Sequence, residues 1–224
     1  MRYRLLLPIV VVFLLVGCKA DEIELRISTK ELLEVLQGGA EDIRFQAEFT
    51  LLAEYDDELK ATIKQIDRIA NRHVEIEEFD VTSSDFGLKI ELEGTIPLLF
   101  VGENSGQISS KSPWVVAVAN NPTRGTLKTF PHVLIFSAST SLQPFLAELQ
   151  GVNFMLTPDK FQPVKFRLRN NADTSLRIFT AGVEVDNETR VVYESTVDGR
   201  TSLTMKGGVY NRAPPMIFFD LREQ

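Results

Sequence analysis

Residues 43–54, IRFQAEFTLLAE, alternate apolar and polar side chains more regularly than any other part of this 224-residue chain. One face would carry Ile43, Phe45, Ala47, Phe49 and Leu51, and the other would carry Arg44, Gln46, Glu48 and Thr50. Because successive side chains of a β-strand point to opposite faces, the pattern predicts a strand that is buried on one side. Such a strand requires neighbours and a covering layer, since an isolated hairpin is only marginally stable.

The same alternation predicts strands on both sides of this stretch. Upstream, Ile23, Leu25 and Ile27 alternate with charged residues. Downstream, strand patterns occur at residues 74–83, 86–100, 114–122, 132–138, 164–171, 175–187, 189–197, 201–207 and 216–221. The Asp198-Gly199 pair between two of these strands is typical of a tight hairpin turn.

Amphipathic helices are predicted at residues 29–37, 57–72 and 139–151. Ser28 and Glu31 form a capping box at the start of the first helix, and two glycines follow its end. Pro144 is tolerated in the first turn of the third helix, and Gly151 is expected to end it. The predicted fold class is therefore α+β: a mostly antiparallel β-sheet with two to three amphipathic helices.

Residues 102–113 have little apolar periodicity and are predicted to form a long loop. This loop could divide a helix-rich subdomain from a strand-rich one. A single α+β domain is favoured, because the early strands need partners from the rest of the chain. The expected division is a signal segment at residues 1–17 and one folded domain at residues 18–224.

Composition limits the class of partner. Without residues 1–17, the 24 basic residues lose Arg2 and Arg4, so 22 basic residues stand against 31 acidic ones and the net charge is about −9. An acidic chain of this kind has no general attraction for nucleic acid. Cys18 is the only cysteine, so no intrachain disulfide can form, and a hydrophobic core must stabilise the fold.

The first eighteen residues combine a basic start, an apolar run and the cysteine. Arg2 and Arg4 precede a twelve-residue apolar run from Leu5 to Val16, which is too short to span a bilayer as a helix. The run ends in Leu15-Val16-Gly17-Cys18, which resembles the lipobox of a bacterial lipoprotein signal. The resemblance implies cleavage after Gly17, a diacylglyceryl group on the Cys18 sulfur and an acyl chain on its new amino group. The alternatives are an ordinary cleaved signal, or an uncleaved anchor with a chance cysteine.

The residue after the lipidated cysteine is expected to determine the destination of the protein. In enterobacteria-like sorting, Asp at this position favours the inner membrane, whereas this chain has Lys19. The resemblance thus implies the periplasmic face of the outer membrane, with the inner membrane or the cell surface as alternatives. Two or three acyl chains hold a protein on a membrane far more firmly than one.

Two longer segments carry a further resemblance. Residues 17–37, GCKADEIELRISTKELLEVLQ, and residues 165–192 are similar to parts of a group of uncharacterised gammaproteobacterial lipoproteins, often associated with phage or mobile elements. That group has no assigned activity. The order of elements also resembles tubular lipid-binding domains, in which a curved antiparallel sheet wraps around helices.

Residues that could support catalysis or metal binding are sparse. His73 is expected at the C-terminal end of a helix, where the helix dipole favours a cation. His132 has no acidic neighbour within four residues. Glu91 and Glu93 share a strand face, but Lys89 extends the same row, which is typical of a solvated surface. Residues 102–106, GENSG, have the wrong spacing for a nucleophilic serine motif.

One strand has an unusual row of positive charge. Lys165, Arg167 and Arg169 fall on the same face, and Arg177 from the next predicted strand could join them. This strip could bind an anion or an acidic partner. The alternative is an ordinary polar face paired with acidic residues on neighbouring strands.

The late aromatic residues are more numerous than two thin layers require, so they either fill the core or line an apolar cleft. They are Trp114, Phe130, Phe136, Phe145, Phe154, Phe161, Phe179, Phe218 and Phe219.

These observations favour a non-enzymatic, lipid-anchored periplasmic protein that binds another envelope component, such as an envelope protein. No cofactor is expected beyond the covalent lipid on Cys18, and no metal. The alternative is a carrier that buries a lipid or other amphiphile between the sheet and the helices at 29–37 and 57–72. A hydrolase is a third hypothesis.

Overall fold

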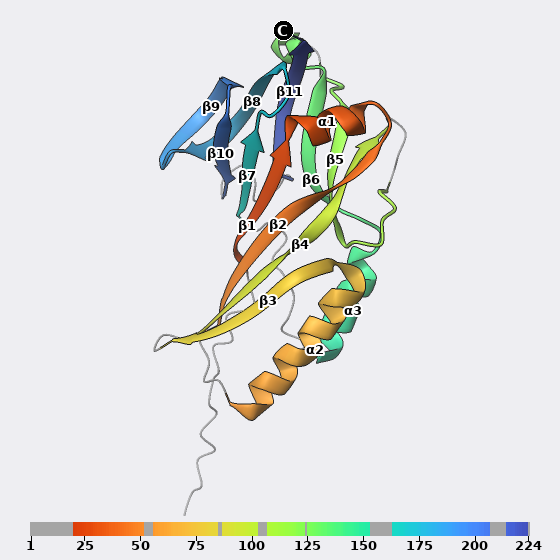
Figure 1. The fold of residues 1–224 in the computed structure, drawn as a ribbon, viewed down its shortest axis with the longest axis vertical. Coiled ribbons are helices and arrows are strands. Elements are labelled where there is room, and N and C mark those ends of the chain that lie inside the picture. The colour runs from red at the N-terminus through yellow and green to blue at the C-terminus, as the bar shows by residue number, and fades with distance from the viewer. Residues whose placement is uncertain are drawn as a thin grey trace, which may run out of the picture.

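In a computed structural model, the chain forms one continuous β-sheet that is closed at one end and covered by helices at the other (Figure 1). The structure describes residues 20–51, 56–84, 87–102, 107–123, 125–152, 163–206 and 214–223. The described strands are β1 (Ala20–Ser28), β2 (Ala40–Leu51), β3 (Glu75–Ser84), β4 (Gly87–Val101), β5 (Trp114–Asn120), β6 (His132–Ala138), β7 (Val164–Arg169), β8 (Thr174–Val185), β9 (Glu188–Val197), β10 (Arg200–Met205) and β11 (Met216–Glu223). The described helices are α1 (Thr29–Leu36), α2 (Asp57–His73), α3 (Leu142–Val152) and a 3₁₀ helix, η1 (Gly125–Thr129).

The α+β class predicted from the sequence is confirmed, with a more specific architecture. Nine strands, in the order β10-β7-β1-β2-β4-β5-β6-β11-β8, form a closed barrel. Most neighbouring pairs are antiparallel, as predicted, but β1 pairs with β7 and β4 pairs with β5 in parallel. Strands β3 and β9 lie outside the ring and pair with β4 and β8 respectively.

Closure of the barrel depends on a bend in β8. Its first half, Thr174–Phe179, pairs with β11, whereas Val183 and Glu184 pair with Met205 and Thr204 of β10. Gly182 lies between these halves with φ +64°, a backbone conformation that side chains other than glycine rarely adopt. The bend allows one strand to meet both ends of the ring.

Helix α1 packs into the barrel core at the end opposite to α2 and α3 (Figure 1). The predicted capping box is present: Ser28 Oγ accepts from the Glu31 amide, and the Glu31 carboxylate accepts from the Ser28 amide. Leu32 and Val35 are buried in the same apolar cluster as Leu25, Phe166 and the other inward-facing strand residues. The barrel interior at this end is therefore filled by side chains.

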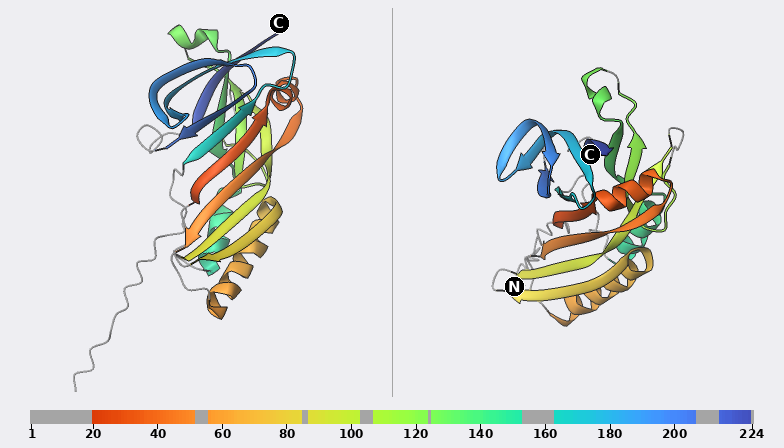
Figure 2. Two further views of the ribbon diagram at one scale, coloured as in Figure 1. Left: turned by 60° about the vertical axis from the view of Figure 1, so that its left-hand side comes forward. Right: turned by 45° about the horizontal axis from the view of Figure 1, so that its top comes forward.

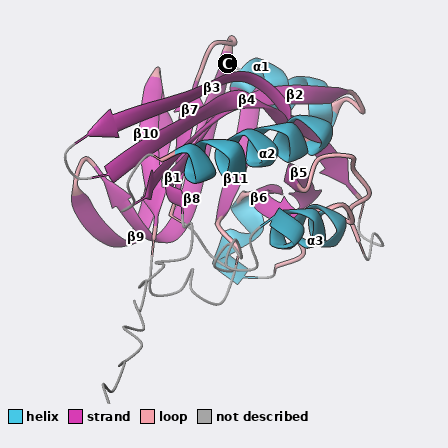
Figure 3. Cartoon of the chain, turned by 90° about the horizontal axis from the view of Figure 1, so that it is seen from below, coloured by secondary structure: helices cyan, strands magenta, loops and turns pink. Residues whose placement is uncertain are grey.

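Helices α2 and α3 form a separate layer beside the long strands β2, β3 and β4 (Figures 2 and 3). The Asp56 side chain caps α2 by accepting from the Leu59 amide, and Pro144 lies in the first turn of α3, as predicted. Three apolar clusters are distinct: the barrel core, a cluster around Phe145 and a cluster around Ile63. The helical layer thus packs on the sheet through two small clusters that are separate from the barrel core.

One turn differs from the sequence prediction. Asp198-Gly199 connects β9 to β10, but these strands are not paired, since β10 pairs with β7 and β8. The tight hairpin turn is Asp186-Asn187, between the antiparallel strands β8 and β9, with φ of 50° and 65°. Asp and Asn tolerate these positive φ values. The strands before and after residues 102–113 belong to the same sheet, because β4 pairs directly with β5.

Candidate apolar binding site

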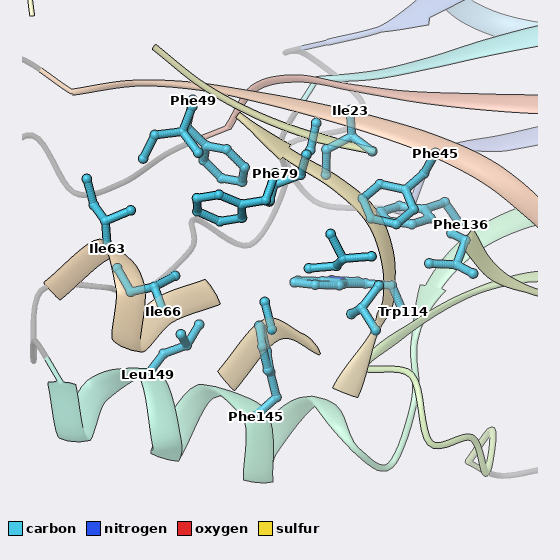
Figure 4. Close-up of a pocket in the computed structure, with 17 residues that line it drawn as sticks. Ile23, Phe45, Phe49, Ile63, Ile66, Phe79, Trp114, Phe136, Phe145 and Leu149 are labelled. Carbon is cyan, nitrogen blue, oxygen red and sulfur yellow. The ribbon is translucent and has the colours of Figure 1, made fainter. Parts of the chain in front are cut away.

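An open apolar pocket of about 150 Å³ lies between the inner face of the sheet and helices α2 and α3 (Figure 4). The inward-facing side of β2 and β4 belongs to the barrel core at Ile43 and Ile96, and then becomes the pocket wall at Phe45 and Leu92. The pocket therefore continues the barrel interior beyond the part that is filled by side chains.

Every described residue that lines the pocket is apolar. The sheet supplies Ile23, Phe45, Ala47, Phe49, Ile76, Phe79, Ile90, Leu92, Ile96, Trp114 and Phe136. The helical layer supplies Ile63, Ile66, Ala70, Phe145 and Leu149, and Val74 follows α2 directly. A site of this composition has no described polar side chain to orient a charged substrate, so it selects for apolar groups.

The pocket lies where the three apolar clusters meet. Its walls include Ile96 from the barrel core, Phe145 from the second cluster and Ile63 from the third. Protein interiors are normally close-packed. This pocket is a gap that the three clusters leave between them. Phe145 packs edge-on against Trp114, with ring centroids 5.4 Å apart, which gives the pocket a rigid aromatic end.

Polar contacts at one end of the helices connect α2 to α3. His73 Nε2 lies 3.0 Å from Glu148 Oε1, and Arg72 Nη2 donates to Glu148 Oε2 at 2.5 Å. The His73 ring also packs edge-on against Phe145 at 5.3 Å. His73 ends α2, as predicted, and its described role is to hold α3 beside α2 at the pocket.

The predicted lipidation residues lie outside the described part of the chain. These are Gly17, Cys18 and Lys19. Strand β1 begins at Ala20, and its residue Ile23 lines the pocket.

The predicted basic strip is largely neutralised by β1. Glu24 is buried, and its carboxylate lies 2.7 Å from Arg167 Nε, 2.9 Å from Arg26 Nε and 3.7 Å from Lys165 Nζ. Lys165 also lies 3.3 Å from Glu22. These contacts correspond to the alternative reading, a polar face paired with acidic residues.

The other two members of the predicted strip are placed differently. Arg169 is exposed at the end of β7. Arg177 does not join the row, because β10 lies between β7 and β8. Its guanidinium contacts Glu194 at 2.9 Å and lies 5.2 Å from the centroid of the Phe130 ring.

The remaining candidates form no reactive group in the described structure. His132 and His73 lie on separate elements, and no cluster of three metal-ligating side chains occurs among the described residues. Lys89 lies 2.8 Å from Glu91 and 3.0 Å from Glu48 on an exposed face. These hydrogen bonds raise the pKa of the Lys89 amine, so the row that contains Glu91 is a network of surface ion pairs.

The aromatic residues divide between the two roles that the sequence left open. Trp114, Phe136 and Phe145 line the pocket, whereas Phe219 is buried in the barrel core. Phe179 packs against both Phe130 and Phe218. Phe154 and Phe161 lie outside the described residues. Three further pocket aromatics, at 45, 49 and 79, have ordinary strand alternation as their only sequence signal.

The pocket has a different second helical wall from the one that the carrier hypothesis named. The sequence placed an amphiphile between the sheet and the helices at 29–37 and 57–72, but α1 supplies none of the described lining residues. The second helical wall is α3 instead, because α1 is buried at the other end of the barrel.

No family model, curated protein or solved structure matches this chain. Within the described ranges, no helix is both long and apolar enough to cross a bilayer.

Proposed function

We propose that this protein is a non-enzymatic, lipid-anchored binder of an envelope amphiphile, whose acyl chain enters the pocket between the sheet and α2–α3. The observation that carries the proposal is the lining: an open cavity whose described walls are apolar throughout and include aromatic rings from both the sheet and α3. A headgroup would stay outside, because none of the described lining residues could bind it.

The size of the pocket limits how much of a ligand it holds. A cavity of about 150 Å³ accommodates a benzene-sized group, which corresponds to about six carbon atoms. Burying six methylene groups at about 0.8 kcal/mol each is worth at most about 5 kcal/mol, so the Kd is no tighter than roughly 0.2 mM. Binding of that strength suits transient capture of one end of an acyl chain, and deeper entry would require α2 and α3 to move apart.

The proposed anchor supports a function at the membrane surface. Ile23 is five residues from Cys18 and forms part of the pocket wall. If acyl chains on Cys18 hold the chain in a membrane, the pocket lies within about 18 Å of the anchoring residue along the backbone. Lipids in that membrane are then the nearest source of apolar ligands. We propose the outer membrane, on the basis of Lys19.

Binding of an uncharged fluorescent probe, N-phenyl-1-naphthylamine, tests the pocket, because its phenyl ring is the size of group that the pocket holds. We expect the probe to gain fluorescence with the wild-type protein and to be displaced by decanoate. Ala70 lies on the pocket wall, so Ala70→Leu should fill part of the cavity and weaken binding at least tenfold. Ala61→Leu makes the same change at an exposed position of the same helix and should leave binding unchanged.

Both variants must retain the circular dichroism spectrum of the wild type. Failure of the wild type to bind the probe would contradict the proposal. So would equal binding by the Ala70→Leu and Ala61→Leu variants, because the probe would then occupy another surface.

A further inference from the structure

The two strands outside the barrel ring each have one long edge without a partner among the described strand pairings. Strand β3 pairs with β4, and β9 pairs with β8. An unpaired edge exposes backbone N–H and C=O groups that can accept another strand. Figure 2 shows the β8–β9 hairpin on the outside of the sheet, away from α2 and α3.

The two edges differ in charge. Strand β3 carries Glu75, Glu77, Glu78 and Asp80, and like charges at these positions disfavour pairing with a second copy. Strand β9 carries both signs, with Arg190 between acidic residues of the same strand. Only the β9 edge is therefore electrostatically suited to pairing with itself.

Strand β9 also exposes apolar side chains on both of its faces. Val191 is 82% exposed and Val192 is 59% exposed, and adjacent residues of a strand point to opposite sides. An exposed apolar strand edge is a site of association, which proteins avoid unless a partner covers it. The exposed segment is close to the Asp186-Asn187 turn, so a second molecule can approach it.

We propose that two copies of this protein associate through their β9 edges, as antiparallel strands about a two-fold axis centred on Val192. In this register Val192 faces Val192 of the second copy. Arg190 faces Glu194 on both sides of the axis, and on the opposite face of the sheet Val191 faces Tyr193. Directly opposed apolar pairs and opposite charges are the pairs that stabilise antiparallel strands. The interface is isologous, so it closes at a dimer.

Other symmetric registers are less favourable. A centre at Arg190 or at Glu194 places each of these charged residues opposite its own copy, and a centre at Val191 places Glu188 opposite Glu194. In the single chain Arg190 contacts Glu188, and Glu194 contacts Arg177 at 2.9 Å. These pairs are at least partly exposed and cost little to rearrange.

Introduced cysteines test both the pairing and its register. The full-length chain with Cys18→Ser has no other thiol, and it makes the result independent of the proposed lipid. In the proposed register, Val192→Cys brings two Cα atoms to about 4.5–5.5 Å, a range that a disulfide spans. Val191→Cys is the matched control: it is more exposed, but its two copies are diagonal neighbours, about 7–8 Å apart.

Under mild oxidation at micromolar concentration, we expect the Val192→Cys chain to form a covalent dimer on non-reducing gels. Its yield should exceed that of the Val191→Cys chain at least fivefold. Equal yields would indicate random collision, and a higher yield from Val191→Cys would indicate another register. Either result, or no dimer from both chains, would overturn the proposal. None of these outcomes depends on the apolar pocket.

Discussion

At the scale of single residues, Gly94 of β4 is a position that does not tolerate a side chain. A Cβ atom there would lie 2.2 Å from the carbonyl oxygen of Glu75 on β3. The close approach occurs beside the bulge between Ile76 and Glu78, where the β3–β4 register shifts. Since the clash is with backbone, Gly94→Ala should lower the free energy of unfolding by about 1–3 kcal/mol, measured by urea denaturation.

Gly151→Ala provides the control for this prediction. Gly151 lies in α3, and an added Cβ would meet no atom within 4 Å. Because alanine favours the helical backbone more than glycine, this variant should be unchanged or more stable by up to about 1 kcal/mol. Equal destabilisation by both variants would show that the close approach at Gly94 is not the cause.

A second residue-scale prediction concerns His132, at the start of β6. Its Nδ1 atom is buried without a hydrogen-bond partner in the described structure. Burial lowers the pKa of the imidazole below its ordinary value of 6.5, although the nearby Asp220 carboxylate acts in the opposite direction. The unfolded chain therefore binds a proton more readily than the folded one. The contribution of His132 to stability is present above pH 6.5 and decreases as the pH falls below it.

We expect the wild type to lose more stability than the His132→Phe variant between pH 7 and pH 5. The measurement is the free energy of unfolding of both proteins at several pH values. Carboxylates titrate in both proteins, so the difference between the two curves isolates His132. If the two curves ran parallel, His132 would not be the cause of the pH dependence.

At the scale of elements, the separate apolar clusters predict that the helical layer unfolds more easily than the barrel. Phe145 connects α3 to Trp114 and to His73 of α2. Phe145→Ala should therefore accelerate amide hydrogen exchange in α2 and α3 and leave the exchange of β1 and β7 nearly unchanged. Hydrogen exchange followed by mass spectrometry measures both regions in one experiment.

Phe166→Ala is the matched comparison, because Phe166 is fully buried in the barrel core. This variant should destabilise the whole protein by about 3–5 kcal/mol and accelerate exchange in all elements. If Phe145→Ala also accelerated exchange in β1 and β7, the two layers would be one cooperative unit.

The elements themselves were largely predictable, because their signals are local. The alternation at 43–51 is strand β2, the Ser28–Glu31 capping box begins α1, and Pro144 lies where a helix tolerates it. The pocket was predictable only as an open alternative. Phe45, Trp114 and Phe145 come from three distant segments, and each of them alone has the pattern of an ordinary core residue.

At the scale of the whole molecule, the barrel depends on pairings that no local pattern indicates. Strand β1 pairs in parallel with β7, so that Ile23 lies opposite Val164, far away in the sequence. The ring is closed by the pairs Thr204–Glu184 and Met205–Val183, with Lys206 Nζ 2.7 Å from Glu184. Hydrophobic periodicity indicates which face of a strand is buried, but it does not indicate which strand is its neighbour.

The strand that follows the proposed anchor, β1, is part of the barrel ring, so the anchor would hold the barrel close to the membrane. Strand β1 lies between β2 and β7, and it begins two residues after Cys18, the proposed lipidation site. Cys18→Ala should move the protein from membrane pellets to the soluble periplasmic fraction, because diacyl attachment would be lost. Lys19→Asp should keep the protein in the pellet but shift it from the outer to the inner membrane. Retention of the Cys18→Ala protein in the pellet would show that another part of the chain reaches the membrane. An intact wild-type protein without added acyl mass would contradict the lipid anchor itself. The proposed amphiphile would then need another route to the apolar pocket, which Ile23 lines.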